Sequence, residues 1–294
     1  MKKINLLIEE ELEDQDSPAY ESIYTFLGRE GEQDYEVDEY GLEIVELPER
    51  DIVSEDPFVS VIIPAYNEER YIEATIDSVL AQGRDEHQLE IIVVANGCND
   101  RTAEIAKYCT PYVHEIEERG ISIAKNYGFE KTLGEVVIFL DADTIMKKGT
   151  IDLIVESLQE GYVAGKTAIL PDENSMSAKA YFKWVNMCGR LSQLLTHFNP
   201  KLNNGASACL FSTYDQLNVL LQEEGYLFNP DLKVMEDVEL IGRLRTQGPF
   251  KFLTKKEVIT STRRFKEEGY IKQFFKDFRD YFNPQNVDER IDYR

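Results

Sequence analysis

The sequence predicts an α/β fold with a mostly parallel central sheet flanked by helices. Short apolar runs rich in β-branched residues, typical of buried strands, alternate with amphipathic segments between residues 58 and 143. Such alternation is typical of parallel strands joined by helices. Polar residues follow three of these strands directly, at the sheet edge where ligands of such folds gather.

The strand and helix signals follow one another in a regular order. The apolar residues of the first helix share one face and are Ile72, Ile76, Val79 and Leu80. Asn99 or Asp100 can cap the second helix. The expected elements are strands at 59–64, 89–94, 112–116 and 136–140, and helices after Asn67, at 101–109 and at 121–131.

Beyond Asp143 the pattern is looser, and it suggests three regions overall. Helices are expected at 151–158, 177–198, 214–221, 236–245 and 270–282, with one strand at 162–170. We therefore predict an acidic N-terminal extension (1–56), one large α/β domain (57–266) and an amphipathic helical tail (267–294).

Charge is distributed unevenly over the 294 residues. The net charge is −23, and residues 1–56 hold 4 lysines and arginines against 19 acidic residues. An acidic surface repels phosphate backbones, so nucleic acid is not an expected partner. Glu9 to Glu11 interrupt the apolar start, which makes it a poor secretory signal. The four cysteines show no C-x-x-C spacing, and we expect reduced thiols in a cytoplasmic protein.

Asp141-Ala142-Asp143 is the strongest local signal for chemistry. Most D-x-D triplets lie in solvated loops, but this one ends a buried apolar strand. If strand geometry persists, both carboxylates point to the same side. Two adjacent carboxylates repel each other, so a divalent cation or a hydroxyl-rich ligand is expected between them and a phosphate.

Two other charged pairs allow either a purely structural or a functional interpretation. Glu236-Asp237 opens a predicted helix, where acidic residues are favoured in any case, but either residue could serve as a general base. Spacing alone favours the first explanation. Arg263-Arg264 could clamp a diphosphate, although exposed arginines are the more common case.

Several common catalytic patterns are missing from the sequence. Residues 161–167 resemble a phosphate loop but are one residue short between the glycines and follow a helix instead of a strand. Neither a G-x-S-x-G elbow nor a G-x-G-x-x-G turn occurs. The three histidines are too scattered for a zinc site.

Taken together, these segments resemble the family-2 glycosyltransferases with the GT-A fold. The resemblance covers residues 58–265 and depends on the order and spacing of five motifs. They are VSVIIPAYNEE at 59–69, IVVANGCNDRT at 92–102, GISIAKNYG at 120–128, DAD at 141–143, and GY at 225–226 with MEDVEL at 235–240.

The resemblance implies transfer of a sugar, with inversion, from a UDP- or GDP-sugar to a hydroxyl of a glycan, a lipid-linked acceptor or a small molecule. It implies Asp237 as the base, supported by Glu236, with Asp141 at the ribose and Asp143 at a divalent metal, Mg²⁺ or Mn²⁺. The expected nucleotide-sugar-binding residues are Pro64, Tyr66, Glu68, Asn96, Lys125, Asp141, Arg263 and Arg264.

Two departures from the family pattern affect these roles. Many members have Asp-Asp where this chain has Ala95-Asn96, which makes uracil less certain and leaves guanine open. No histidine follows Asp237, so a metal ligand that the family has late in the chain is missing here. Either phosphates and waters complete the coordination shell of the metal, or the dependence on metal is weak.

Aromatic stripes at 181–195 and 270–282 favour core packing, with peripheral contact at the inner membrane face as the minority alternative. Two other functions fit parts of the sequence. A nucleotidyltransferase normally has a glycine-rich loop where this chain has AYNE at 65–68. A non-catalytic nucleotide-sugar-binding protein with a decayed site is favoured slightly by residues 95–96 and disfavoured by the intact Asp141, Asp143 and Asp237.

Overall fold

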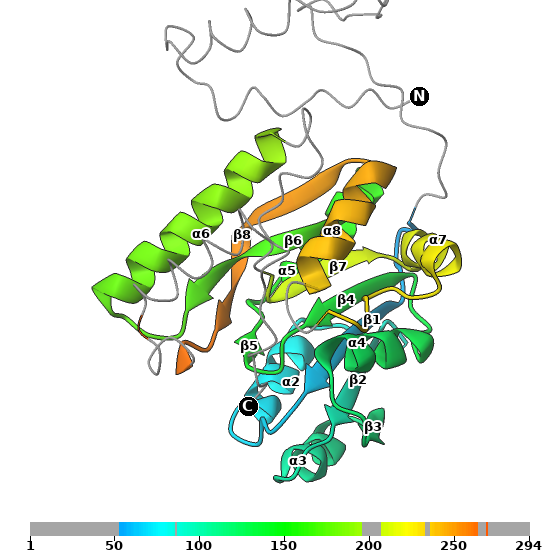
Figure 1. Cartoon of the computed structure of the whole chain (residues 1–294), viewed down its shortest axis with the longest axis vertical. Helices are drawn as coiled ribbons and strands as arrows, with labels where there is room; N and C mark the ends of the chain where they lie inside the picture. The colour runs from blue at the N-terminus through cyan, green and yellow to red at the C-terminus, as the bar shows by residue number, and fades with distance from the viewer. Residues whose placement is uncertain (1–52, 86, 196–206, 233–235, 264–268, 270–294) are drawn as a thin grey trace, which may run out of the picture. The chain divides into compact units, whose positions relative to one another are not determined.

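The structure, a computed structural model, describes residues 53–85, 87–195, 207–232, 236–263 and 269. These residues form one eight-stranded sheet with helices on both faces (Figure 1). The strand order is β3-β2-β1-β4-β7-β6-β8-β5. The predicted acidic extension falls outside the described residues except for 53–56, and so does the predicted tail except for Gly269.

The first half of the sheet confirms the predicted alternation of strands and helices. Strands β1, β2, β3 and β4 are parallel neighbours, and the connecting helices begin and end within about two residues of the predicted positions. These elements are β1 (Val59–Ala65), α2 (Ile72–Leu80), β2 (Leu89–Asn96), α3 (Thr102–Cys109), β3 (Val113–Ile116), α4 (Ile121–Glu130) and β4 (Val136–Leu140).

The second half of the sheet contains three strands that the sequence pattern did not predict: β5, β7 and β8. Strand β7 is antiparallel to both β4 and β6, while β8 runs parallel to β6 and antiparallel to β5. The sheet therefore stays mostly parallel, as predicted. The elements are β5 (Thr144–Ile145), α5 (Thr150–Gln159), β6 (Ala164–Pro171), α6 (Met176–Leu195), β7 (Cys209–Thr213), α7 (Tyr214–Glu224), α8 (Glu236–Gln247) and β8 (Phe250–Thr260).

Strand β8 is interrupted by a bulge. Thr167 of β6 pairs with Leu253 and Ile169 pairs with Val258, so one residue of β6 faces four residues of β8. Lys256 within the bulge has a φ of 56°, a left-handed backbone conformation that is uncommon outside glycine. The bulge carries the sequence Thr-Lys-Lys-Glu at 254–257.

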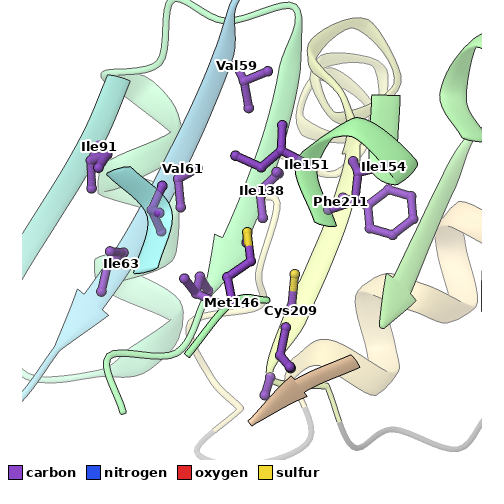
Figure 2. Packing of buried hydrophobic residues seen from close by; sticks show 14 of the residues in the cluster. Val59, Val61, Ile63, Ile91, Ile138, Met146, Ile151, Ile154, Cys209 and Phe211 are labelled. Carbon is purple, nitrogen blue, oxygen red and sulfur yellow. The ribbon is translucent and has the colours of Figure 1, made fainter. Parts of the chain in front are cut away.

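Two apolar cores lie on the two faces of the sheet. One packs α2, α5 and α6 against the strands, and the other packs α4, α7 and α8. Figure 2 shows part of the first core, where side chains of Val61, Ile138 and Ile151 meet between strands and helix. A β-carbon on Gly165 would lie 2.6 Å from the carbonyl oxygen of Lys251, so this strand position requires glycine.

The helix faces agree with the sequence pattern except at one residue. Leu80 was expected on the buried face of α2, but this was wrong: its side chain is 47% exposed because α2 ends there and the chain turns away. The aromatic residues Tyr181 and Phe182 of α6 are buried, which confirms core packing for that stripe. Within the described part of the chain, no helix is long and apolar enough to cross a membrane.

Candidate active site

The loops after β1 and β2 are joined by side-chain hydrogen bonds. Asn67 has a φ of 56°, which asparagine adopts more readily than most residues. Its Oδ1 accepts a hydrogen bond from the backbone nitrogen of Asn99 at 2.9 Å. The backbone nitrogen of Glu68 donates to Thr102 Oγ1 at 2.7 Å, and Thr102 Oγ1 donates to Asp100 at 2.5 Å. The two loops therefore form one continuous edge where the strands end.

Asn96 uses both ends of its carboxamide inside the protein. Its Nδ2 donates to the carbonyl oxygen of Glu118, and its Oδ1 accepts from the backbone nitrogen of Gly120 at 2.8 Å. Asn96 therefore holds the loop between β3 and α4. Arg119 in this loop places its guanidinium 5.0 Å from the centre of the Tyr66 ring, so an aromatic face and a cation lie together at this edge.

Arg263 connects two carboxylates from different loops. Its guanidinium donates to both carboxylate oxygens of Glu68, with Nη1 2.5 Å from Oε2, and Nη2 lies 3.5 Å from Asp143 Oδ2. Strand β8 leads directly into this contact, because the backbone nitrogen of Ser261 donates to the carbonyl oxygen of Asp143 at 3.2 Å. The sequence pattern suggested a role for Arg263 but did not indicate these partners.

The carboxylate of Asp143 suits a hard divalent cation. Its side chain is 16% exposed and borders a cavity of about 70 Å³ that Asp172 and Ser261 also line. Among the residues that the structure describes, no three histidine, cysteine, aspartate or glutamate side chains are placed to hold a metal by themselves. Mg²⁺ often binds only one or two carboxylates and takes its other ligands from substrate phosphates and water. Asp143, with Asp141 two residues before it, fits such a shared site.

The acid pair that opens α8 is held by a buried lysine. Lys125 from α4 places its Nζ 2.9 Å from Glu236 Oε1 and 2.6 Å from Asp237 Oδ1. The Lys125 side chain is 2% exposed, and the ring of Phe228 lies 4.8 Å from its Nζ. These contacts join α4 to α8, although Lys125 is 111 and 112 positions away from the two acids in the sequence.

The charges in this cluster influence one another strongly. Burial raises the pKa of Asp237 to about 6, with Lys125 opposing and Glu236 reinforcing the change. Burial by itself lowers the pKa of Lys125, but Asp237, Glu236 and Asp141 outweigh it and raise the pKa. Lys125 therefore stays protonated, and it links the acid pair electrostatically to the D-x-D turn after β4.

One further buried lysine lies near Asp237 and was missed by sequence reasoning. Lys166 on β6 is 1% exposed. Its burial and, to a smaller extent, the charge of the nearby Arg245 lower its pKa to about 7, while the charge of Asp237 opposes this change. Lys166 falls within residues 161–167, the segment that only partly matches a phosphate loop. A lysine inside an apolar strand was the available signal, because lysine is rarely buried without a partner.

The predicted residues gather in two groups along one edge of the sheet. The first joins Glu68, Asp143 and Arg263, and the second joins Lys125, Glu236 and Asp237 by direct contacts. Pro64 is buried within β1, opposite Val94. Arg264 lies outside the described residues.

A broad surface depression lies away from these groups. A wide depression of about 520 Å³ lies over α3 and contains none of the predicted site residues. Its lining includes Arg101, Lys107 and Tyr108, which are exposed.

A mixed sheet of this order, with carboxylates at the ends of β1 and β4, defines a GT-A-type nucleotide-binding fold. Residues 60–213 match the profile of the family described as glycosyl transferase family 2, and the chain belongs to this family.

Two curated relatives illustrate the similarity. The chain is 32% identical over 140 residues to glycosyltransferase AglE of Haloferax volcanii, covering 45% of this chain and 46% of the relative. It is 35% identical over 145 residues to an undecaprenyl-phosphate 4-deoxy-4-formamido-L-arabinose transferase of Pectobacterium atrosepticum, covering 46% and 43%. The chain thus matches less than half the length of either relative.

Solved structures show the same fold at lower identity. Residues 1–349 of Staphylococcus aureus TarS in complex with UDP-GlcNAc give a TM-score of 0.55 at 19% identity, covering 69% of this chain and 58% of that TarS chain. Glucosyl-3-phosphoglycerate synthase of Mycobacterium tuberculosis, with Mn²⁺, UDP and its product, gives 0.53 at 21% identity, covering 76% and 80%.

Proposed function

We propose that the protein transfers a sugar from a nucleoside diphosphate sugar to an acceptor hydroxyl, with inversion at the anomeric carbon. One observation carries the proposal: Lys125 contacts the acid pair of α8 and also lies within electrostatic reach of Asp141 in the D-x-D turn. The proposed general base and one donor-side carboxylate therefore both interact with one buried cation. This arrangement suits a reaction in which an acceptor attacks a bound donor.

Asp237 is the proposed base. Its raised pKa makes it a stronger proton acceptor than an ordinary aspartate, while still ionised at neutral pH. The carboxylate takes the proton of the acceptor hydroxyl as the hydroxyl oxygen bonds to the anomeric carbon. The bond from that carbon to the diphosphate breaks, and the nucleoside diphosphate leaves with the electron pair. Glu236 and Lys125 hold Asp237 in place.

On the donor side, different residues are proposed to bind the nucleobase and the diphosphate. Tyr66 with Arg119 offers a stacking face for the nucleobase, and Glu68 orders Arg263, whose guanidinium suits a phosphate. Asp143, with Asp141, would hold Mg²⁺ or Mn²⁺. When bound, such an ion neutralises charge on the leaving diphosphate.

The names of the similar proteins suggest which donors and acceptors to test first. UDP appears in the TarS and glucosyl-3-phosphoglycerate synthase complexes, which makes UDP-sugars the first donors to test, with GDP-sugars second. The name of the Pectobacterium relative indicates a lipid phosphate acceptor for that protein. We include a lipid-linked hydroxyl among the acceptors proposed for this chain, which would act on the cytoplasmic side of a membrane.

The test separates donor binding from turnover. Calorimetry with UDP and GDP, each with and without Mn²⁺, measures binding, and release of nucleoside diphosphate from donor sugars measures turnover. Asp143→Asn should abolish the metal-dependent part of binding, and Asp237→Asn should retain binding but lose turnover. Asp152→Asn on the surface of α5 is the matched control. Binding without turnover with any donor and acceptor would favour the non-catalytic alternative, and no binding at all would reject the proposal.

A further inference from the structure

Helix α6 differs in charge from the rest of the chain. The protein carries 55 aspartate and glutamate residues among 294, yet the 20 residues of α6 include none. Three cations occur in this helix, and Lys183 and Arg190 among them are exposed. An acid-free helix with exposed cations is unexpected in a protein of net charge −23.

The outward face of α6 is also apolar. Met176, Met187 and Leu191 are 85%, 51% and 47% exposed. With Lys183 and Arg190 they follow helical spacing along one side, opposite the aromatic residues that pack on the sheet. Apolar side chains flanked by cations are the pattern of a helix that lies in a membrane interface.

The β8 bulge and the turn between β5 and α5 extend this cationic face. They contribute Lys147, Lys148, Lys255 and Lys256, of which all but Lys147 are exposed. Thr150 Oγ1 donates to the carbonyl oxygen of Lys256 at 3.1 Å, which joins the turn to the bulge.

The one acidic residue of the bulge is already neutralised. Lys147 Nζ lies 2.8 Å from Glu257 Oε2. Burial alone would raise the pKa of Glu257, but the hydrogen bond from Lys147, a hydrogen bond from its own backbone and the charges of Lys147 and Arg190 together lower it. Glu257 therefore connects α6 to the bulge and leaves the surplus charge positive.

We propose that this α6–β8 surface, defined by Lys147, Lys148, Lys183, Arg190, Lys255 and Lys256 with the apolar residues of α6, docks on a bilayer containing anionic lipids. Cations near such a bilayer are attracted to its headgroups, and the exposed methionines and leucine enter the interface. A soluble polyanion would leave the apolar side chains without a partner. A second copy of the chain would place like charges together.

The surface is connected to the candidate active site by one strand. Arg263 follows Lys256 by seven residues, and strand geometry over that stretch spans roughly 20 Å. Docking would therefore hold the sheet edge near the membrane, where the lipid-linked acceptor included in the proposed function would be found. The docking inference itself requires neither a particular donor nor turnover.

Vesicle co-sedimentation tests the inference directly. The full chain is mixed with vesicles of phosphatidylcholine alone, or of phosphatidylcholine with phosphatidylglycerol, at low and high salt. We expect binding to the mixed vesicles only, weakened by salt. Lys255→Glu/Lys256→Glu should lower the partition coefficient by about tenfold or more, and Met187→Gln/Leu191→Gln should lower it as well.

Matched variants control for net charge and folding. Lys107→Glu/Lys131→Glu makes the same change in net charge on other parts of the molecule and should bind vesicles like the unmodified chain. Melting temperature and nucleotide binding, measured on every variant, should stay unchanged, so failure of docking is distinguishable from failure of the proposed function. Absence of vesicle binding, an equal loss in the control pair, or binding of inorganic polyphosphate without vesicle binding would overturn the inference.

Discussion

Replacing Lys125 by methionine should destabilise the protein in a pH-dependent way. Each of its two contacts, at 2.9 and 2.6 Å, is worth roughly 6 kcal/mol of attraction at an effective dielectric constant of about 20. The cost of removing the ammonium from water offsets much of this. Methionine keeps most of the volume but leaves Glu236 and Asp237 side by side without a cation. Such a loss typically costs about 3 to 5 kcal/mol, or roughly 10 °C in melting temperature.

The dependence on pH follows from the direction of the pKa change. The folded-state pKa of Asp237 lies above its value in the unfolded chain, so the folded state holds the proton more tightly. The free energy of unfolding therefore falls as pH rises from about 4 to about 6. Without Lys125, which lowers the pKa of Asp237, the pKa of Asp237 rises further, and the pH interval over which stability falls extends upward. The loss caused by Lys125→Met should therefore be larger at about pH 8 than at about pH 5.

Urea denaturation at both pH values measures this loss. Lys131→Met, at an exposed lysine on the end of α4, should change stability by no more than about 0.5 kcal/mol. Adding Glu236→Gln to Lys125→Met should recover part of the stability, because one buried acid remains instead of two. A loss that is equal at the two pH values, or that stays below about 1 kcal/mol, would refute the ion-pair reasoning.

Three other predictions follow from the site. Turnover at saturating donor and acceptor should rise with pH through the region near 6, as Asp237 loses its proton, and a flat profile measured across this range would contradict its role as base. Arg263→Gln should let Mn²⁺ alone bind on the order of tenfold tighter, because Asp143 loses a competing cation, and it should weaken the binding of UDP. Paramagnetic resonance titration measures the affinity for Mn²⁺ in both conditions. A change of both affinities in the same direction would disprove the competition. Asn96→Asp should cost about 1 to 3 kcal/mol in urea denaturation, because a carboxylate oxygen would face the carbonyl of Glu118, and unchanged stability would show that this contact is unimportant.

The first half of the fold was predictable because its signals are local. The strands β1, β2 and β4 are apolar runs rich in valine and isoleucine, and every residue in each of them is buried. Polar residues at or just beyond their carboxyl ends, including Glu68, Asn96 and Asp141, were selected for that place, and the parallel pairing brings these strand ends to one sheet edge.

The second half was less predictable because tertiary contacts determine its strands. Strand β7 has only five residues and is antiparallel to both of its neighbours, β4 and β6. The pattern of β8 is broken by Lys255 and Lys256, which leave the ladder in the bulge. No periodicity could indicate that Lys125 reaches the acids of α8, since that contact depends on the packing of two helices.

The chain separation of the site contacts has a consequence for folding. Arg263 and Glu68 are 195 residues apart in sequence, whereas β1, β2 and β4 are joined through short local helices. Distant pairings require closure of long loops and form more slowly than local ones. The sheet from β3 to β4 can therefore assemble early, before β8 delivers Arg263 to the carboxylates. During synthesis the donor side would acquire its shape first, and its electrostatic balance would be completed only when β8 pairs and brings Arg263 to Glu68.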